Sequence, residues 1–450
     1  MTEDFANYRP VSNLPFLSKI FEKCAILQLD KYLQENNLYP ENQSAYRKGH
    51  SCETALLKIV NDIQMDIEKK SMVALVLLDL SSAFDTIDHD RLLKKLEHDF
   101  GICGNALKWL RSYLTNRTFA VHIMYYEGKP VIMIYGVPQG SILGPLLFVL
   151  YIHDLVYIAR HHGLDAHFYA DDSQIYIGFN PLTTTTVTVK TIQDCVHDID
   201  HWMSINFLKL NISKTKVIFF GRPNDFRLYD IDMTLGKKHF KSSDKLSVKS
   251  LGVHLDSRLN MQTMVSKCCS SCYSTLKSLQ SIRWYMPIET KLTLVKTTIL
   301  SKIDYCNILL LNSSTTVIGK LQRLLNACIR FIYNLRKTQP VTEYSKQCHI
   351  LPVKFRVLYK SCVMAYKLVN NLAPDYLSSM TIRAISTRTR DNLRSGNDTL
   401  KLQLPQCKTT LQYKLSENWN KLPLALRDST NIEMFKKELK TYCYRLAYES

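Results

Sequence analysis

The sequence predicts an α+β protein, in which strands alternate with helices up to about residue 256 and helices alone follow. Three observations support this fold class. The run at 72–80 is rich in Val, Ala and Leu, which is typical of a buried central strand. Short apolar stretches on either side of Asp171 and Asp172 predict the two strands of a hairpin. From residue 257 onward, apolar residues recur at the spacing of amphipathic helices.

The charge distribution divides the chain into two unlike parts. The 450 residues are enough for about two or three domains, and 46% hydrophobic content indicates a globular core. Residues 1–180 hold 17 Lys and Arg against 21 Asp and Glu, whereas residues 181–450 hold 41 against 19. The second part therefore suits a polyanionic partner, with nucleic acid as the first candidate. A basic surface without such a partner is the alternative.

Cysteine usage and hydropathy favour a reducing, intracellular location and no membrane partner. Thirteen cysteines are scattered, and the cluster at 268–272 lacks a second Cys/His pair at zinc-finger spacing. The most apolar run, at 142–159, is interrupted by proline, histidine and aspartate, so it is a poor membrane span. Nucleus and cytoplasm remain equal alternatives.

The first elements are two helices joined by a basic loop. Arg47 and Lys48 stand beside a glycine in the loop at 42–51, where two cations and a close backbone approach could hold a phosphate. A solvated loop is the alternative. A helix is expected at 53–69, and an earlier one at 15–33. The apolar residues of that earlier helix are expected on one face, and they are Leu17, Ile20, Phe21, Cys24 and Leu27.

Three acids are expected to converge at one edge of the sheet. Asp79 stands at the C-terminal end of the strand at 72–80, where packing does not account for it. The carboxylates of Asp171 and Asp172 repel each other, so a neighbouring cation would stabilise the pair. Mg²⁺ prefers such oxygen ligands. This arrangement predicts a two-metal site, with the carbonyl of Leu80 completing one shell. A solvated Asp-Asp turn is the alternative.

Two further segments could serve such a site. The loop at 136–145 holds three glycines and two prolines before a helix expected at 145–159, which suits close approach to a ligand or merely a tight connection. A basic turn at 208–216 leads into a strand, and its Lys214 could protonate or neutralise a pyrophosphate. A surface lysine without a role is the alternative. One more strand is expected at 247–255.

The last part is expected to be a basic helical bundle. Helices are predicted at 262–283, 288–311, 316–333 and 353–370. A basic linker at 381–406 and a small unit ending in a helix at 431–447 would follow. The helical cations suit contacts along a nucleic-acid backbone. They are Lys267, Lys277, Arg283, Lys320, Arg323, Arg330, Arg336 and Lys337.

At this point the residues resemble a known family. Tyr-Ala-Asp-Asp at 169–172 resembles the catalytic hairpin of reverse transcriptases, and the segment at 76–85 is similar to their first catalytic motif. Gly-Val-Pro-Gln-Gly-Ser at 136–141 is similar to their template- and nucleotide-positioning loop. The segments at 210–215 and 250–253 are similar to the two motifs that follow, in the family's order.

The surrounding segments are similar to those of one branch of the family. Asn-Tyr-Arg-Pro-Val-Ser at 7–12, the segment at 84–89 and Ala-Pro-Asp-Tyr-Leu at 373–377 resemble non-LTR, LINE-type retrotransposon enzymes. Trp-Asn-Lys-Leu-Pro at 419–423 resembles the C-terminus of jockey-like members. The endonuclease of full elements and the start of the fingers are not expected within this sequence.

The resemblance implies a right-hand polymerase that acts as an RNA-directed DNA polymerase, a nucleotidyltransferase using an RNA template, a DNA primer and dNTPs. The alternatives are a catalytically inactive truncated remnant that only binds nucleic acid, and an RNA-templated RNA polymerase. The oligomeric state is left open. The implied organisation is partial fingers at 1–70, an RRM-like palm at 71–256 (a reverse transcriptase domain at roughly 1–256), a helical thumb at 257–372, and a basic linker with a small C-terminal unit at 373–450.

The resemblance also implies roles for individual residues. Asp79, Asp171 and Asp172 would be the ligands of two Mg²⁺ ions, or of Mn²⁺ in their place. The Phe84 ring would exclude a ribose 2′-hydroxyl, and Lys214 would be the candidate general acid. The nucleotide contacts would be Arg47 and Lys48 over the triphosphate, with Gln139 and Gly140 touching the template or the nucleotide. The basic helices would grip an RNA–DNA duplex.

Overall fold

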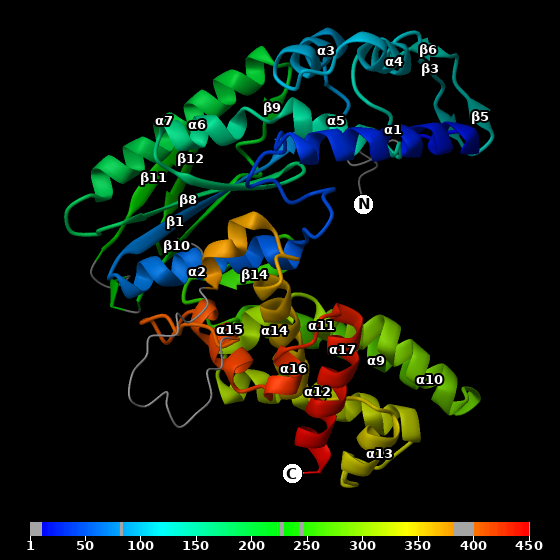
Figure 1. The fold of residues 1–450 in the computed structure, drawn as a ribbon, viewed down its shortest axis with the longest axis vertical. Helices are drawn as coiled ribbons and strands as arrows, with labels where there is room; N and C mark the ends of the chain where they lie inside the picture. The colour runs from blue at the N-terminus through cyan, green and yellow to red at the C-terminus, as the bar shows by residue number, and fades with distance from the viewer. Residues whose placement is uncertain are drawn as a thin grey trace.

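The strand predicted at 72–80 is an inner strand of the main sheet in the computed structural model shown in Figure 1. It belongs to a four-stranded antiparallel sheet in the order β10-β1-β8-β7. Six of its seven residues are buried, so the prediction of a buried central strand is confirmed. The strands are β1 (Met72–Leu78), β7 (Asp165–Tyr169), β8 (Asp172–Phe179) and β10 (Lys216–Phe220).

The structure describes residues 11–81, 84–222, 224–225, 229–243, 247–381 and 400–449. Three predictions fall partly outside these residues: most of the motif at 7–12, positions 82–83 of the first catalytic motif, and most of the linker at 381–406.

Helices cover both faces of the sheet, which explains why β1 is apolar on both sides. Successive strand residues point to opposite faces. Ala74 and Val76 enter a core shared with helices on one face, whereas Val73 and Leu75 enter a core shared with α2 (Cys52–Glu68) and the C-terminal helices. The helices of the first face are α3 (His89–His98), α4 (Gly104–Leu114), α5 (Gly144–Tyr151), α6 (Leu155–His161) and α7 (Thr185–Ile205).

The single helix predicted at 145–159 is wrong, because the structure has a break between α5 and α6. Residues 152–154 form a turn there. The Asp154 carboxylate accepts from Lys95 Nζ at 2.6 Å and from Trp202 Nε1 at 3.2 Å. These contacts hold the polar residues of the turn against α3 and α7, which periodicity within the apolar run does not reveal.

Helix α1 (Phe16–Glu35) forms as predicted, but its predicted apolar face is not the face through which it packs. Leu17 and Phe21 are both 65% exposed. The helix packs through another face, with Leu33 in the first core and Glu22 buried against the chain before α5. Periodicity defines an apolar face but does not say whether the chain supplies a partner for it.

The second face of the sheet is covered by α2 (Cys52–Glu68) and then by the helical part of the chain. A capping box begins α2, where Ser51 and Thr54 exchange side-chain to backbone hydrogen bonds. The predicted helix at 288–311 is wrong as one element, since a π-helical turn at Lys296–Leu300 and a 3-10 segment at Asn307–Asn312 divide it. The helices are α9 (Gln262–Gln280), α10 (Ile288–Val295), α11 (Ser301–Asp304), α12 (Thr315–Tyr333), α13 (Thr342–Gln347) and α14 (Val353–Val369). No helix in the described ranges is long and apolar enough to cross a membrane.

The single strand predicted at 247–255 is wrong, because the structure forms a tight hairpin there. Leu251 and Gly252 have φ of 43° and 80°, and two consecutive positive φ values are typical of a two-residue hairpin turn. Tyr305 donates to the Leu251 carbonyl at 2.7 Å and thereby joins this hairpin to α11. The small ladders are β13 (Ser247–Ser250) with β14 (Val253–Asp256), β2 (Leu80–Ser81) with β9 (Lys209–Leu210), β3 (Thr118–Phe119) with β6 (Val131–Ile132), β4 (His122–Ile123) with β5 (Tyr126–Glu127), and β11 (Asp232–Leu235) with β12 (Lys238–Lys241).

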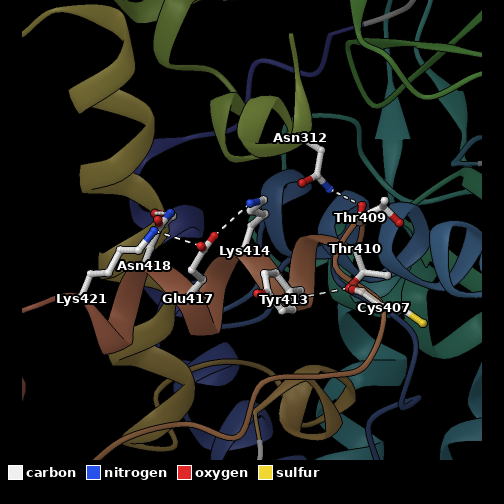
Figure 2. A network of polar contacts seen from close by, with 10 residues as sticks. Asn312, Cys407, Thr409, Thr410, Tyr413, Lys414, Glu417, Asn418 and Lys421 are labelled. Carbon is white, nitrogen blue, oxygen red and sulfur yellow. Dashed lines mark hydrogen bonds and ion pairs between the residues drawn. The ribbon is translucent and has the colours of Figure 1, made fainter. Parts of the chain in front are cut away.

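The C-terminal unit is tied to α2. Asn61 and Gln64 accept hydrogen bonds from the first backbone N–H groups of α15, at 3.0 and 2.9 Å. Figure 2 shows the start of this helix, where Thr410 accepts from the N–H of Tyr413, and Glu417 between Lys414 and Lys421. The helices of the unit are α15 (Leu411–Asn420), α16 (Leu424–Arg427) and α17 (Ile432–Tyr448).

Candidate active site

Two of the three predicted acids stand at adjacent strand ends. In the β1–β8 ladder Leu78 pairs with Ser173, so Asp79 and Asp172 meet at the same edge of the sheet. Both carboxylates line one small cavity of about 60 Å³, together with Lys214. The Asp79 side chain is 42% exposed, which leaves its oxygens accessible to a ligand from solvent.

The third acid lies in the hairpin turn itself. Tyr169 pairs with Asp172, which leaves Ala170 and Asp171 as a two-residue turn, shorter than predicted. Ala170 has φ of 55°, a conformation that is uncommon for a residue with a side chain. Asp171 is partly exposed and does not line the cavity of the other two acids.

A buried glutamine outside the hairpin fixes this turn, and sequence reasoning missed it. Gln43 is 1% exposed, and its Oε1 accepts from the N–H groups of Ala170 and Ala45 at 3.1 and 3.0 Å. The segment around it pairs with β7, because Ser44 donates to the Phe168 carbonyl and Phe168 donates to that of Asn42. The sequence shows only a glutamine in a basic loop. Nothing around it indicates that its side chain contacts the hairpin turn.

Lys214 is the cation beside Asp79. Its Nζ lies 3.9 Å from Asp79 Oδ2, and the side chain is 68% exposed. The N–H of Asn211 donates to the Asp79 carbonyl at 2.8 Å, and Asn211 Oδ1 accepts from the N–H of Lys214 at 3.2 Å. The turn at 211–214 is therefore anchored on Asp79 by its backbone, which keeps Lys214 near this acid while its side chain stays exposed.

The glycine-rich loop reaches the segment after Asp79 from the other side. Gln139 Nε2 donates to both carboxylate oxygens of Asp85, at 2.8 and 2.9 Å. Gly136 has φ of 82°, and a Cβ there would lie 2.8 Å from the Asp85 carbonyl oxygen, so the close approach requires glycine. The Phe84 ring is half-buried, with its centroid 4.7 Å from that of Phe148 in α5. Gly140 is exposed at the tip of the same loop, with φ of 102°.

These residues belong to a region that matches a known family. Residues 3–255 match the family described as reverse transcriptase (RNA-dependent DNA polymerase). The chain belongs to the reverse transcriptase family. The resemblance inferred from the motifs is thereby confirmed.

Curated reverse transcriptases of mobile elements are similar to the chain. The probable RNA-directed DNA polymerase from transposon BS of Drosophila melanogaster is 28% identical over 293 residues, which is 64% of this chain and 31% of the relative. That of the X-element is 35% identical over 150 residues, covering 33% and 16%. The enzyme from mobile element jockey is 26% identical, covering 58% and 28%. The predicted non-LTR, jockey-like relationship is confirmed, and the chain spans less than a third of the length of these relatives.

Solved polymerases also align with this reverse transcriptase chain, at low identity. Telomerase from Candida Tropicalis in complex with a TWJ fragment of telomeric RNA is 12% identical, covers 82% of this chain and 57% of that one, and has a TM-score of 0.41. The RNA-dependent RNA polymerase of a human picobirnavirus is 14% identical, covers 73% and 55%, and has a TM-score of 0.35.

Reverse transcriptases depend on divalent metal ions in general. The donor set fits such ions, since Asp79 and Asp172 offer accessible carboxylate oxygens at one cavity. The described residues nevertheless contain no group of three or more His, Cys, Asp or Glu side chains placed to hold a metal. Leu80, whose carbonyl was the fourth predicted ligand, lies in β2 and pairs with Leu210 of β9.

The predicted triphosphate contacts of the family lie at a different cavity. Arg47 and Lys48 line a space of about 910 Å³ together with Asp375 and Tyr376. Arg47 is engaged within the protein, because its Nη1 donates to the carbonyls of Pro40 and Gln43 at 2.8 and 3.1 Å. Lys48 is exposed. Neither residue lines the cavity of Asp79 and Asp172.

The basic residues predicted on the helices fall into two sets. Five of them line one groove between α9 and α12: Lys277, Arg283, Arg323, Arg330 and Lys337. Lys267 and Lys320 lie on the same two helices but do not line that groove, and neither does Arg336.

Proposed function

We propose that this chain is an RNA-directed DNA polymerase, which adds dNTPs to the 3′-hydroxyl of a DNA primer on an RNA template. The single observation that supports this proposal best is the meeting of Asp79 and Asp172 at one cavity, within the region that matches the reverse transcriptase family. Asp171 precedes Asp172 in the turn, and Lys214 stands beside Asp79. A family match alone would not require these side chains to remain together.

Each residue of the site has a distinct proposed role. Asp79, Asp171 and Asp172 would hold two Mg²⁺ ions, or Mn²⁺, with the Leu80 carbonyl as a further ligand. Bound there, such ions lower the pKa of the attacking 3′-hydroxyl and neutralise the triphosphate. The Lys214 ammonium can neutralise or protonate the departing pyrophosphate, because its exposed side chain is free to turn toward a ligand at the cavity.

The nucleotide and its template would lie across the sheet edge. Phe84 and the loop carrying Gln139 and Gly140 approach the end of β1 from the first face. Arg47 and Lys48 would contact the triphosphate only if the nucleotide also reached their cavity. The domain roles that accompany the proposal are fingers at 1–70, palm at 71–256, a thumb at 257–372 that grips the RNA–DNA duplex, and a C-terminal unit at 373–450.

Primer extension on a defined RNA template tests this proposal. The full chain is incubated with a labelled DNA primer, Mg²⁺ and dNTPs, beside Asp171→Asn and a matched Asp165→Asn control. Asp165 is an exposed acid at the opposite end of the same hairpin. We expect extension by the parent and by the Asp165 variant, and none by the Asp171 variant.

Other outcomes separate the alternatives. Equal extension by the parent and Asp171→Asn would mean that the catalytic site is assigned wrongly. Absence of extension with salt-sensitive binding to the duplex would favour the inactive nucleic-acid-binding remnant. Preference for rNTPs over dNTPs would favour an RNA-templated RNA polymerase.

A further inference from the structure

The groove between α9 and α12 is strongly basic. It has a volume of about 890 Å³, and none of its lining residues is Asp or Glu. None of its cations forms an ion pair within the described part of the chain. Its positive potential is therefore not neutralised by the protein itself. The five cations that line this α9–α12 groove are Lys277, Arg283, Arg323, Arg330 and Lys337.

One buried donor in the lining of the groove adds to this charge. Arg330 Nε is buried and has no hydrogen-bond partner among the described residues, whereas its Nη2 donates to the Gln339 carbonyl at 3.3 Å. A buried donor without a partner costs free energy that an anionic ligand can recover. The guanidinium group of Arg330 therefore favours an anion in the groove.

Exposed aromatic rings continue the groove beyond α9. Trp284 and Tyr285 are 67% and 88% exposed in the 3-10 turn Arg283–Tyr285, and Tyr273 on the groove wall is 43% exposed. The Arg283 guanidinium carbon lies 4.3 Å from the centre of the Trp284 ring, which joins the cationic and aromatic surfaces. Aromatic platforms beside a basic groove are typical of sites for unpaired nucleic acid, whose bases offer free faces for stacking.

We propose that the α9–α12 groove binds a single-stranded polynucleotide, with phosphates along the five cations and bases stacked on Trp284 and Tyr285. The phosphates of a duplex could contact the cations of the groove. Its bases could not stack on the aromatic rings, because paired bases already stack on one another. The groove lies within the part of the chain proposed as the thumb, so the proposal gives these cations a single strand in place of a duplex, and it does not depend on polymerisation. None of its lining residues lines the cavity of Asp79.

Tryptophan fluorescence tests the proposal without dNTPs or metal. The full chain is titrated with oligouridine or oligodeoxythymidine of about 16 nucleotides. We expect the emission of Trp284 to be quenched, and most of the quenching to be absent in Trp284→Phe. Trp419 is fully buried and serves as an internal reference. For five contacts, log affinity should fall against log salt concentration with a slope of about −3.5.

A charge-reversal pair supplies the matched control. Lys277→Glu with Arg323→Glu alters two exposed groove residues, and Lys437→Glu with Arg445→Glu makes the same charge change on α17. We expect the groove variant to lose about tenfold or more in affinity for either strand, and the α17 variant about twofold or less. The circular dichroism of both variants checks their folding.

Two results would overturn the proposal. One is equal affinity of the parent and the groove variant for both oligonucleotides. The other is an RNA–DNA duplex that binds as tightly as the single strands and quenches Trp284 equally, which would make the groove part of the duplex contact. Binding of only the oligouridine or only the oligodeoxythymidine supports the proposal and shows whether the groove binds RNA or DNA. A failure of primer extension leaves all of these outcomes unchanged.

Discussion

The hydroxyl of Tyr376 lies 2.8 Å from Ser44 Oγ, although 332 residues separate the two positions. Ser44 Oγ is also 2.8 Å from His167 Nε2 in β7, and the Tyr376 hydroxyl donates to Thr54 Oγ1 at 2.9 Å. Tyr376 belongs to the 3-10 segment Asp375–Met380 that follows α14. The segment that follows α14 is thus fastened beside the hairpin that carries Asp171.

We expect Tyr376→Phe to weaken this connection. Losing the hydroxyl removes its hydrogen bonds and leaves buried partners less satisfied, which should lower the free energy of unfolding by about 1–2 kcal/mol. In primer extension, kcat should fall more than KM rises, because β7 leads directly into the turn with Asp171.

Urea unfolding and steady-state extension measure the two effects. Tyr125→Phe is the control, since Tyr125 is fully exposed on the arm at 118–132 and should change neither quantity. Unchanged stability of Tyr376→Phe would mean that this hydroxyl contributes nothing to holding the segment after α14.

Burial of His167 should make stability depend on pH. Desolvation lowers the pKa of His167 to about 3, with further lowering by the charges of Lys58 and His50, so its imidazole is neutral in the folded chain. The unfolded chain binds the proton at about pH 6.5. Acidification through this range therefore favours unfolding, and the stability present above pH 6.5 is lost progressively as the pH falls toward 3.

Urea unfolding of the parent and of His167→Gln at several pH values isolates this contribution. Between about pH 6 and pH 4, the parent should lose up to about 1.4 kcal/mol per pH unit more than the variant. Carboxylates titrate in both proteins and cancel in the comparison. Parallel pH profiles would show that His167 is not buried in its neutral form.

Glu22 should be an unusually sensitive position on α1. It is 1% exposed, and its Oε2 accepts from the N–H groups of Ile142 and Leu143 at 2.6 and 3.1 Å, directly before α5. Glu22→Ala leaves both donors unpaired and should lower the free energy of unfolding by about 2–4 kcal/mol. Glu22→Gln keeps one acceptor oxygen and should lose less.

Thermal and urea denaturation check this order. Glu35→Ala on the same helix is the control, because Glu35 forms only an exposed pair with Lys31 and should change stability by less than about 0.5 kcal/mol. A Glu22→Ala variant as stable as the Glu35 control would contradict the anchoring of α1 through this carboxylate.

The site could be predicted from the sequence wherever its signal was local. The unbroken apolar run of β1 indicates a strand covered on both faces, and the acid that ends it stands out because packing does not explain it. The short apolar stretches on either side of Asp171 and Asp172 likewise predict their hairpin. Register then brings Asp79 and Asp172 together, because Leu78 pairs with Ser173.

The supports of the site could not be predicted, because their partners are distant in the chain. Gln43 holds the N–H of Ala170 across 127 residues, and neither neighbourhood carries a sign of the other. The exposed face of α1 has a related cause, since an apolar periodicity is the same whether or not a partner covers it. Contacts between residues that are distant in the sequence can be seen only in the structure.

Phe84 offers the sharpest test of substrate selection at the proposed site. Its ring packs on Phe148, so Phe84→Ala should both relax the preference for dNTPs over rNTPs and weaken α5 packing, at a cost of about 2–3 kcal/mol. Phe148→Leu disturbs the same packing from the buried side and should keep the preference. Insertion kinetics with each nucleotide on one RNA template separate these effects. An unchanged ratio of dNTP to rNTP insertion in Phe84→Ala, or an equal change of this ratio in Phe148→Leu, would show that Phe84 is a packing residue and does not contact the nucleotide. The reason is that removing the ring alters this ratio only if the ring occupies the space of a 2′-hydroxyl.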